Sequence, residues 1–370
     1  MRTHNDLSYT TSQLSDPISS GERSISPGGG PAPQERARMK APTLLITIDA
    51  EEDEWGEFDR PDYGVANIAR LAGLQEIFDR YEYRATYVIT TPVAEDDGAV
   101  RLLGSIHERG GCEIGAHCHP WNSPPFVEER SPHNSMLCNL PASLQVEKVG
   151  QLREAIARNL GVDATSFRAG RWGANAELAR GISSLGFVVD SSVTPHVNWA
   201  CAQGPDFDRS YPECYRVSLE DLAEVDPTSA LAEVPVTIGF TGLLRRGGER
   251  LNRAFSAGAA RAVRARGIAT RLGLFRRSWL CPELAGASEM IRLTESLVAS
   301  GRSILNFMFH SGALMAGKTP YVRTAAEEGQ FLRRIERYLQ YCRAKGFVSA
   351  TLTEVGNRAF HVLLAAVSLA

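Results

Sequence analysis

Residues 44–49 read Leu-Leu-Ile-Thr-Ile-Asp, a short apolar run that ends in an acid. Such a run predicts a buried strand, and Asp49 at its end is the first candidate for chemistry. From here to about residue 351, short apolar runs alternate with longer amphipathic segments. This alternation predicts an α/β domain whose strands are parallel.

The other expected strands lie at residues 85–89, 112–116, 167–168, 187–189, 232–238, 304–309 and 347–351. Helices are expected at residues 65–81, 99–109, 143–160, 175–184 and 327–345. About seven or eight strands separated by helices predict a closed or nearly closed barrel, and a doubly wound open sheet has the same periodicity. Both folds place functional residues at the carboxyl ends of the strands, so either predicts the same site.

The sequence divides into a tail, one domain and an insertion. Residues 1–42 are rich in Ser, Gly, Pro and charge, lack a signal peptide's apolar core, and are expected to be disordered. Residues 43–370 are expected to form the domain, ending in a packing helix at residues 359–370 that is too short to span a membrane. Residues 243–279 hold ten Arg against one acid, Glu249, and predict an inserted basic helix.

Charge and cysteine content restrict the partners and the compartment. The formal charge of -3 provides no global basic field, so nucleic acid is not expected as a partner. Seven scattered Cys without a CxxC pair favour a reducing compartment, and we expect a cytoplasmic protein. The Arg-rich insertion has three interpretations: a solvated helix, a peripheral contact with an anionic membrane, or a grip on substrate phosphates.

Ionisable residues follow five of the expected strands: Asp49, the pair His117 and His119, Arg168, Asp190, and His310. Because carboxyl ends of parallel strands converge, these residues are expected to share one pocket. Two His two residues apart on extended backbone point to the same side and suit a metal, although an isolated pair can be coincidental. With a carboxylate they would leave positions open for water and substrate. Asp49 is placed to take a proton from that water, and His310 to protonate a departing amine.

Five segments in this order resemble the motifs of the polysaccharide deacetylases, the NodB-homology family of carbohydrate esterases. They are residues 45–49 (LITID), 113–117 (EIGAH), 167–172 (FRAGRW), 190–192 (DSS) and 309–311 (FHS). Residues 117–122 (HCHPWN) and 317–321 (GKTPY) resemble one branch of that family. The resemblance extends over residues 43–354.

The resemblance implies a distorted (β/α) barrel of about seven parallel strands. It also implies a metal-dependent hydrolase that removes N-acetyl groups from an amino sugar in a polysaccharide, glycoconjugate or sugar precursor. By position, Asp49 resembles the base, Arg168 the residue that orients it, His310 the acid and Asp190 the residue that tunes the acid, while His117 resembles a metal ligand. Zinc is the first expectation for the metal, with cobalt, manganese or nickel as alternatives.

Two positions depart from the family pattern. The family's first motif has two adjacent Asp, the second of which binds metal, and here Ala50 stands in that place. Glu51 is the expected replacement and Asp53 the alternative. The two His are also two residues apart instead of four. These departures keep open a metal-free hydrolase of a cyclic or other non-sugar amide, or a non-catalytic sugar-binding relative.

Three residues beside the motifs are candidates for contact with the substrate. Trp172 and Trp121 could stack on a sugar face, and core packing is the ordinary alternative. Arg171 could hold an anionic group, with a surface ion pair as its alternative. Cys118, between the two His, is expected to face the other side of the strand as a small buried residue.

Overall fold

The computed structural model describes residues 41–60, 62–256 and 265–358. The expectations for residues 1–40 and 359–370 therefore lie outside the described part. The described residues from 41 onward form one compact unit. The N–H of Val348 donates to the carbonyl of Pro42, which fixes the chain just before the first strand.

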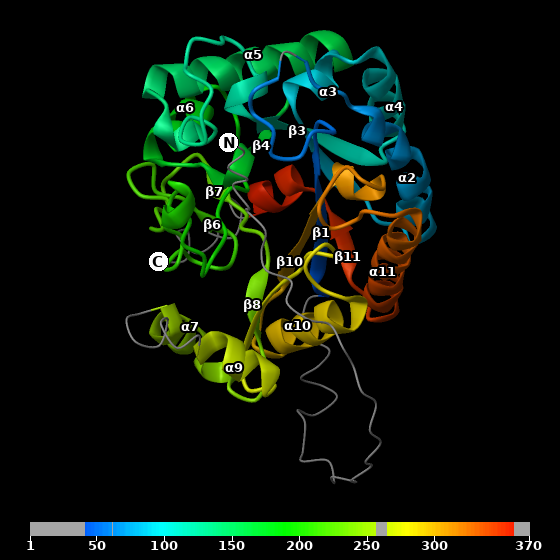
Figure 1. Ribbon diagram of the computed structural model, residues 1–370, viewed down its shortest axis with the longest axis vertical. Coiled ribbons are helices and arrows are strands. Elements are labelled where there is room, and N and C mark those ends of the chain that lie inside the picture. Colours follow the sequence, from blue (N-terminus) through cyan, green and yellow to red (C-terminus); the bar gives the residue numbers. More distant parts are fainter. Residues whose placement is uncertain (1–40, 61, 257–264, 359–370) are drawn as a thin grey trace, which may run out of the picture. The chain divides into compact units, whose positions relative to one another are not determined.

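A nine-stranded, mostly parallel sheet forms the centre of this unit (Figure 1). Its central strand β1 (Thr43–Ala50) is buried at all eight residues. β1 pairs in parallel with β2 (Ala85–Ile89), β10 (Ile304–His310) and β11 (Val348–Ala350). Beyond β2 the order is β3 (Cys112–Cys118), β4 (Ser166–Ala169), β5 (Val189–Asp190), β7 (Ala232–Glu233) and β6 (Tyr215–Arg216). Among these described strands, only β6 and β7 pair antiparallel.

The chain after β7 links the far side of this sheet to β10. Val234 donates its N–H to the carbonyl of Asp190 at 2.8 Å, and Thr237 donates to the carbonyl of Asn306 at 3.2 Å. The sheet therefore curls, and the predicted distorted barrel is confirmed. It has nine mostly parallel strands where about seven parallel strands were expected.

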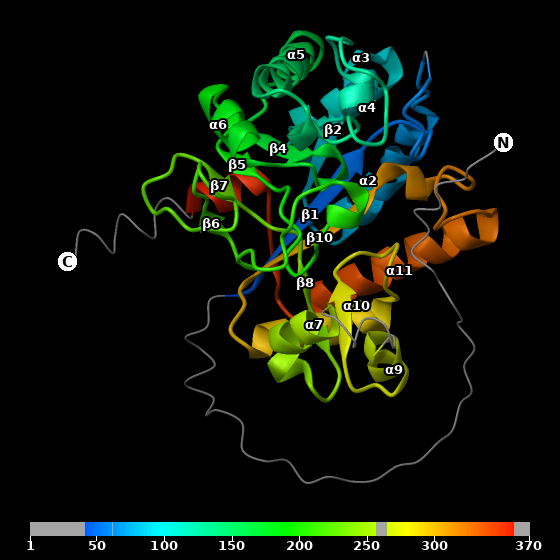
Figure 2. The same cartoon turned by 60° about the vertical axis from the view of Figure 1, so that its left-hand side comes forward.

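Helices pack against the outside of the curled sheet (Figures 1 and 2). They are α2 (Leu71–Arg80), α3 (Thr91–Glu95), α4 (Asp97–Glu108), α5 (Ala142–Leu160), α6 (Ala176–Ser184), α10 (Ala287–Ala299) and α11 (Ala325–Ala344). Short 3-10 segments are η1 (Ala66–Arg70), η2 (Pro120–Asn122), η3 (Leu137–Asn139), η4 (Gly170–Trp172), η5 (Ala200–Ala202), η6 (Arg245–Gly247) and η7 (Ser311–Leu314). None of the described helices is long and apolar enough to cross a membrane.

Local sequence explains where the helices start, stop and pack. α11 begins at a capping box. The side chain of Thr324 accepts the backbone N–H of Glu327, and the side chain of Glu327 accepts the backbone N–H of Thr324. α5 ends at Gly161, whose φ of 68° suits a residue without a side chain. Phe78 of α2 and Phe331 of α11 are buried in the same apolar core as the strands. Burying such faces is the main stabilisation of the fold.

The structure corrects one expected strand and refines the insertion. The strand predicted at residues 232–238 begins where expected but is too long in the prediction. β7 covers only Ala232–Glu233, and Pro235, which has no N–H to donate, precedes a separate strand β8 (Ile238–Thr241). β8 pairs antiparallel with β9 (Arg276–Trp279), which was not predicted because charged residues occupy half of it. Between them lie α7 (Gly248–Ser256) and α9 (Ala265–Arg271), so the insertion is helical as expected.

The strand register brings the candidate residues together. Asp49 on β1 lies beside His310 on β10, and His117 on β3 lies beside Arg168 on β4. All four stand at the carboxyl ends of their strands, and the loops that follow complete the site.

Candidate active site

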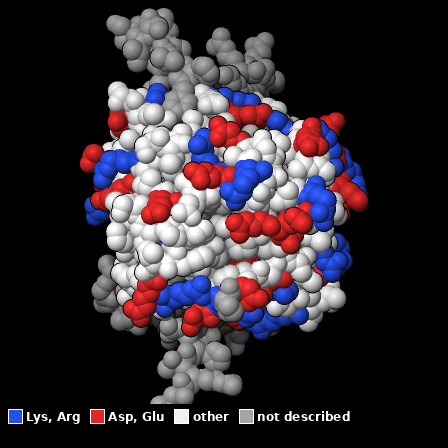
Figure 3. Space-filling model, turned by 90° about the horizontal axis from the view of Figure 1, so that it is seen from above, with Lys and Arg blue, Asp and Glu red and all other residues white. Residues whose placement is uncertain are grey.

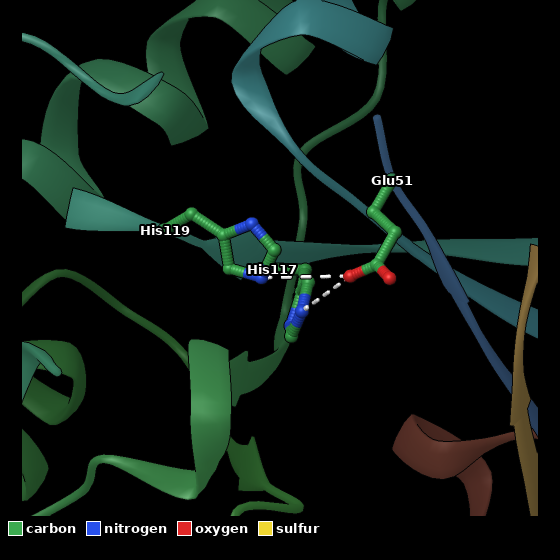
Figure 4. Close-up of side chains that lie close together, drawn as sticks. All are labelled: Glu51, His117 and His119. Atoms are coloured by element: carbon green, nitrogen blue, oxygen red, sulfur yellow. Dashed lines mark ion pairs between the residues drawn. The ribbon is translucent and has the colours of Figure 1, made fainter. Parts of the chain in front are cut away.

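Glu51, His117 and His119 form a cluster of possible metal ligands (Figure 4). Oε2 of Glu51 lies 3.6 Å from Nε2 of His117 and 3.5 Å from Nε2 of His119. All three side chains are buried, and one ligand atom of each lies within 4.8 Å of the others. This spacing suits a single ion whose bonds to nitrogen and oxygen are about 2.0–2.2 Å.

Both imidazoles are oriented by a partner on the nitrogen that faces away from Glu51. Nδ1 of His117 lies 3.0 Å from the carbonyl oxygen of Arg168. Nδ1 of His119 lies 2.8 Å from Oε1 of Glu52. A proton on each Nδ1 leaves the lone pair of each Nε2 directed at the cluster, the arrangement that fixes metal-binding His in proteins.

Trp121 contributes to this support. Its ring stacks on His119 with centroids 4.1 Å apart, and its Nε1 donates to Glu52 at 3.1 Å. The residue is only 5% exposed. One ring face is therefore occupied by His119, and the expected contact of Trp121 with substrate stays a prediction.

The alternative carboxylate, Asp53, is engaged elsewhere. Its Oδ1 accepts from the backbone N–H and side-chain amide of Asn67, at 3.0 and 2.7 Å. Its Oδ2 accepts from the N–H of Ala66 and lies 3.1 Å from Nζ of Lys318. Asp53 thus fixes the loop after β1 to the start of η1, and the geometry favours Glu51 as the third ligand.

The electrostatics of the cluster fit a cation. Burial raises the pKa of Glu51 to about 8, and the carboxylates of Glu52 and Asp49 act in the same direction against the nearby imidazoles. Burial also lowers the pKa of His117, which keeps it neutral and able to donate a lone pair. A divalent ion would offset the cost of the buried carboxylates, so two nitrogens and one oxygen fit a first-row metal.

Asp49 is held by a completely buried arginine. Arg168 forms an ion pair with Oδ1 of Asp49, and its remaining N–H groups donate to Thr47 and Ser191 at 2.8–2.9 Å. Burial opposes ionisation of Asp49, but Arg168, His117 and His310 together hold its pKa below the ordinary range. Oδ2 of Asp49 faces His117 and His310, at 3.8 and 3.7 Å from their Nε2 atoms.

His310 is paired with a carboxylate that sequence reasoning missed. Nδ1 of His310 lies 3.0 Å from Oε2 of Glu283, whose side chain is 2% exposed. Oε1 of Glu283 also accepts the backbone N–H of His310 at 3.1 Å. Burial would lower the pKa of His310, but Glu283 and Glu51 outweigh it and raise the pKa to about 10. Glu283 lies in the loop after β9, where no strand-end pattern or resembled motif marks it.

Asp190 occupies a different part of the site. Its carboxylate accepts from the hydroxyl of Ser192 and interacts with the carboxyl of Glu233 on β7. Burial raises the pKa of Asp190 to about 6 and holds that of Glu233 well above its usual range. The carboxylate in contact with His310 is therefore Glu283, while Asp190 lies against another acid.

Two other candidate residues, Arg171 and Trp172, belong to η4, which follows β4. Trp172 is half-buried, with Cζ of Arg168 5.5 Å from its ring centre and Trp279 6.1 Å away. Arg171 donates to the hydroxyl of Ser135 and stacks 5.1 Å over the ring of Phe58. Burial lowers the pKa of Arg171. Both remain predicted substrate contacts, and Arg171 would have to exchange these partners for a ligand.

An exposed aromatic residue beside His310 was not predicted. Trp55 is 37% exposed, and its ring meets His310 edge-on with centroids 4.8 Å apart. It lines a groove of about 420 Å³ between the loop after β1 and residues 317–320.

Figure 3 views the molecule from above Figure 1, and acidic and basic side chains intermingle there. That face carries no broad field of one sign.

Comparison with known proteins supports the fold. Neither a family model nor a curated protein matches the sequence. A candidate glycoside hydrolase/deacetylase from Parabacteroides distasonis matches with a TM-score of 0.57 and 12% identity, over 86% of this chain and 71% of that one. A candidate polysaccharide deacetylase from Mycobacterium smegmatis matches with a TM-score of 0.47 and 14% identity, over 86% and 91%. At 12% identity, the likeness to the Parabacteroides distasonis structure indicates a shared fold.

Proposed function

We propose that this protein is a metal-dependent hydrolase that removes an N-acetyl group from an amino sugar in a polysaccharide, glycoconjugate or sugar precursor. The observation that carries this proposal is the position of Asp49. Its free carboxylate oxygen lies between His117 of the possible metal cluster and His310, 3.8 and 3.7 Å from them. A base, an acid and a cation site thus surround one small volume.

The protonation states of the two residues suit hydrolysis at neutral pH. Asp49 is ionised because its pKa is held low, and His310 keeps its proton because its pKa is about 10. A divalent ion, zinc or another first-row metal, held by Glu51, His117 and His119 would polarise the amide carbonyl and acidify a water.

The chain's own residues then carry the proton transfers. Asp49 takes a proton from the attacking water as its oxygen bonds to the acetyl carbon. His310 gives a proton to the amine nitrogen as the carbon–nitrogen bond breaks, which releases acetate and the free amino sugar. Arg168 keeps Asp49 oriented and Glu283 keeps His310 oriented. The exposed ring of Trp55 next to His310 provides an apolar surface for a sugar face.

Acetate release from a panel of N-acetylated sugars, including free, oligomeric and nucleotide-linked forms, tests the proposal. We expect a chelator to abolish turnover and zinc, cobalt, manganese or nickel to restore it. His117→Ala should abolish turnover and metal binding together. His133→Ala, which removes an exposed loop histidine, is the matched control and should leave both unchanged.

Each alternative gives a different result. Full turnover by rigorously metal-free protein would rule out the metal role. It would favour a metal-free hydrolase of cyclic or other non-sugar amides. Sugar binding by calorimetry without acetate release, in metal-loaded protein, would identify a non-catalytic relative. Neither result is compatible with the proposed reaction.

A further inference from the structure

The insertion between β8 and β9 exposes an unusual amount of aliphatic surface. Within the described residues, the strongly exposed Leu and Ile side chains all belong to it: Leu243 at 78%, Leu244 at 46%, Ile268 at 54% and Leu272 at 64% exposure. Scattered apolar residues on a surface need no explanation, but four in one short insertion do.

These four residues lie on adjoining pieces of backbone. The N–H of Leu244 donates to the carbonyl of Leu274 at 2.9 Å, which joins the loop after β8 to the turn after α9. Gly242 packs closely against the same turn. A Cβ atom at this position would lie 2.8 and 2.7 Å from the carbonyl oxygens of Gly273 and Leu274. Leu272 follows Ile268 by one helical turn. We refer to Leu243, Leu244, Ile268 and Leu272 as the apolar tip.

The apolar tip is separate from the core that folds the insertion. Phe240, Ala269 and Phe275 are buried together, with Leu251, Phe255 and Leu274 packed against them. Phe240 and Phe275 stack with ring centroids 5.3 Å apart. This inner cluster already buries apolar faces of α7, α9 and the β8–β9 pair, so folding does not require the tip to be apolar.

Basic residues surround the apolar tip. The exposed arginines of the described insertion are Arg245, Arg246, Arg250, Arg253, Arg271 and Arg276. Residues 243–279 contain one acid, Glu249. Among the described residues, Arg246, Arg250 and Arg271 form no ion pair, whereas Arg276 pairs with Glu289 at 2.9 Å. A solvated basic helix explains the arginines but not the exposed aliphatic residues between them.

One interpretation of the sequence was that the arginines of the insertion bind phosphate groups of the substrate. The position of the insertion is relevant to that interpretation. In Figures 1 and 2, α7 and α9 lie beyond β8, on the side away from α3 and α5. The metal cluster consists of Glu51, His117 and His119, and none of these residues belongs to the insertion. Among the described residues, no arginine of α7 or α9 forms an ion pair with the clustered Glu51.

We propose that the apolar tip and its surrounding arginines dock the protein on an anionic lipid surface. The aliphatic side chains would enter the boundary between headgroups and acyl chains, and the unpaired arginines would contact lipid phosphates. Apolar insertion and charge attraction are both needed, because aliphatic residues alone would not select anionic lipid and arginines alone would be screened by salt.

Co-sedimentation of the full chain with vesicles tests this inference. We expect binding to vesicles of equal parts phosphatidylcholine and phosphatidylglycerol, and little binding to phosphatidylcholine alone. The double variant Leu243→Ser, Leu272→Ser should weaken binding by about tenfold or more, since two buried aliphatic contacts are lost. Arg246→Gln with Arg250→Gln should weaken binding and reduce its dependence on salt.

Val127→Ser is the matched control, because Val127 is 73% exposed but lies outside the insertion. It should bind vesicles like the wild type. Thermal unfolding and turnover of a soluble substrate should be unchanged in the tip variants, which separates docking from folding and from the proposed activity. Failure of the wild type to sediment with anionic vesicles would overturn the inference. So would undiminished binding by the double leucine variant, or self-association through the tip that excludes vesicles.

Discussion

His310 and Glu283 form a buried pair in which Nδ1 of the imidazole lies 3.0 Å from Oε2 of the carboxylate. The same carboxylate accepts the backbone N–H of His310 through Oε1, so backbone and side chain are fixed together. This arrangement directs Nε2 of His310 at Asp49, 3.7 Å away. It also explains why His310 holds a proton although it is buried.

Glu283→Gln should therefore move the alkaline limit of activity. Glu283 stabilises the charged imidazole, so its removal lowers the pKa of His310 from about 10 toward or below its usual value. Activity that requires protonated His310 is lost as pH rises through that pKa. We expect the alkaline limb of the kcat/KM profile to move to lower pH, with the acid limb unchanged.

Glu220→Gln controls for the loss of one acidic side chain, because Glu220 is exposed. Its pH profile should match that of the wild type. An unchanged alkaline limb in Glu283→Gln, in protein that folds normally, would mean that His310 is not the acid.

Asp49→Asn should remove the general base while keeping the shape of the side chain. We expect kcat to fall by roughly 100- to 10,000-fold, as is typical when a general base is lost. Substrate affinity and metal content should change little, because Asp49 is not one of the three clustered ligands. Asp97→Asn, an exposed substitution in the first turn of α4, provides the comparison. Turnover within a few-fold of the wild type would rule out Asp49 as the base.

The sequence predicted the fold well because its strands are buried on both sides and read as continuous apolar runs. β1 and β10 were placed within one residue of their observed ends for this reason. Shorter strands contain too few residues to show a clear hydrophobic pattern. β5 has two residues, and β9 is half arginine, so hydrophobic periodicity could not locate their pairing.

The site residues at the ends of strands could also be predicted from the sequence. Asp49, His117, Arg168 and His310 each follow an apolar run, and convergence of parallel strands places them together. Glu283 and Glu52 were not assigned, because their roles depend on loop conformation and on which side chain each carboxylate meets. Spacing along the chain contains no such information.

Glu52→Gln tests the support of the metal cluster. The carboxylate of Glu52 accepts from Trp121 and lies 2.8 Å from Nδ1 of His119, so it fixes the imidazole's orientation and tautomer. An amide is a weaker acceptor. We expect metal affinity to fall by about 10- to 100-fold, the usual effect of losing such a partner. Competition titration with a chelating dye measures this, and Glu54→Gln in the same loop is the control. Equal affinity in both variants would contradict a metal-supporting role for Glu52.

Lys148→Met tests how much Lys148 stabilises the loop that follows His117 and His119. Lys148 is completely buried on α5 and donates to the carbonyls of Pro120, Ser123 and Pro125, while Glu128 lies 2.9 Å from its Nζ. Its loss leaves three carbonyls and a carboxylate without their cation. We expect the free energy of unfolding in urea to fall by about 3–5 kcal/mol, whereas exposed Lys345→Met should change it by less than about 0.5 kcal/mol. A small effect of Lys148→Met would mean that water replaces the ammonium.

Glu233→Gln should change how stability depends on pH. Burial raises the pKa of Asp190 to about 6 and that of Glu233 further above its usual range. Both groups bind protons more tightly in the folded protein, so their stabilisation is complete below about pH 4 and is lost as pH rises through the folded pKa values. The amide side chain of this variant would mimic the protonated acid and retain an acceptor for the N–H of Val193. The decline in unfolding free energy between about pH 5 and 8 should therefore be shallower in Glu233→Gln than in the wild type or in Glu220→Gln. Parallel curves for all three proteins would show that the two carboxyl groups ionise without cost.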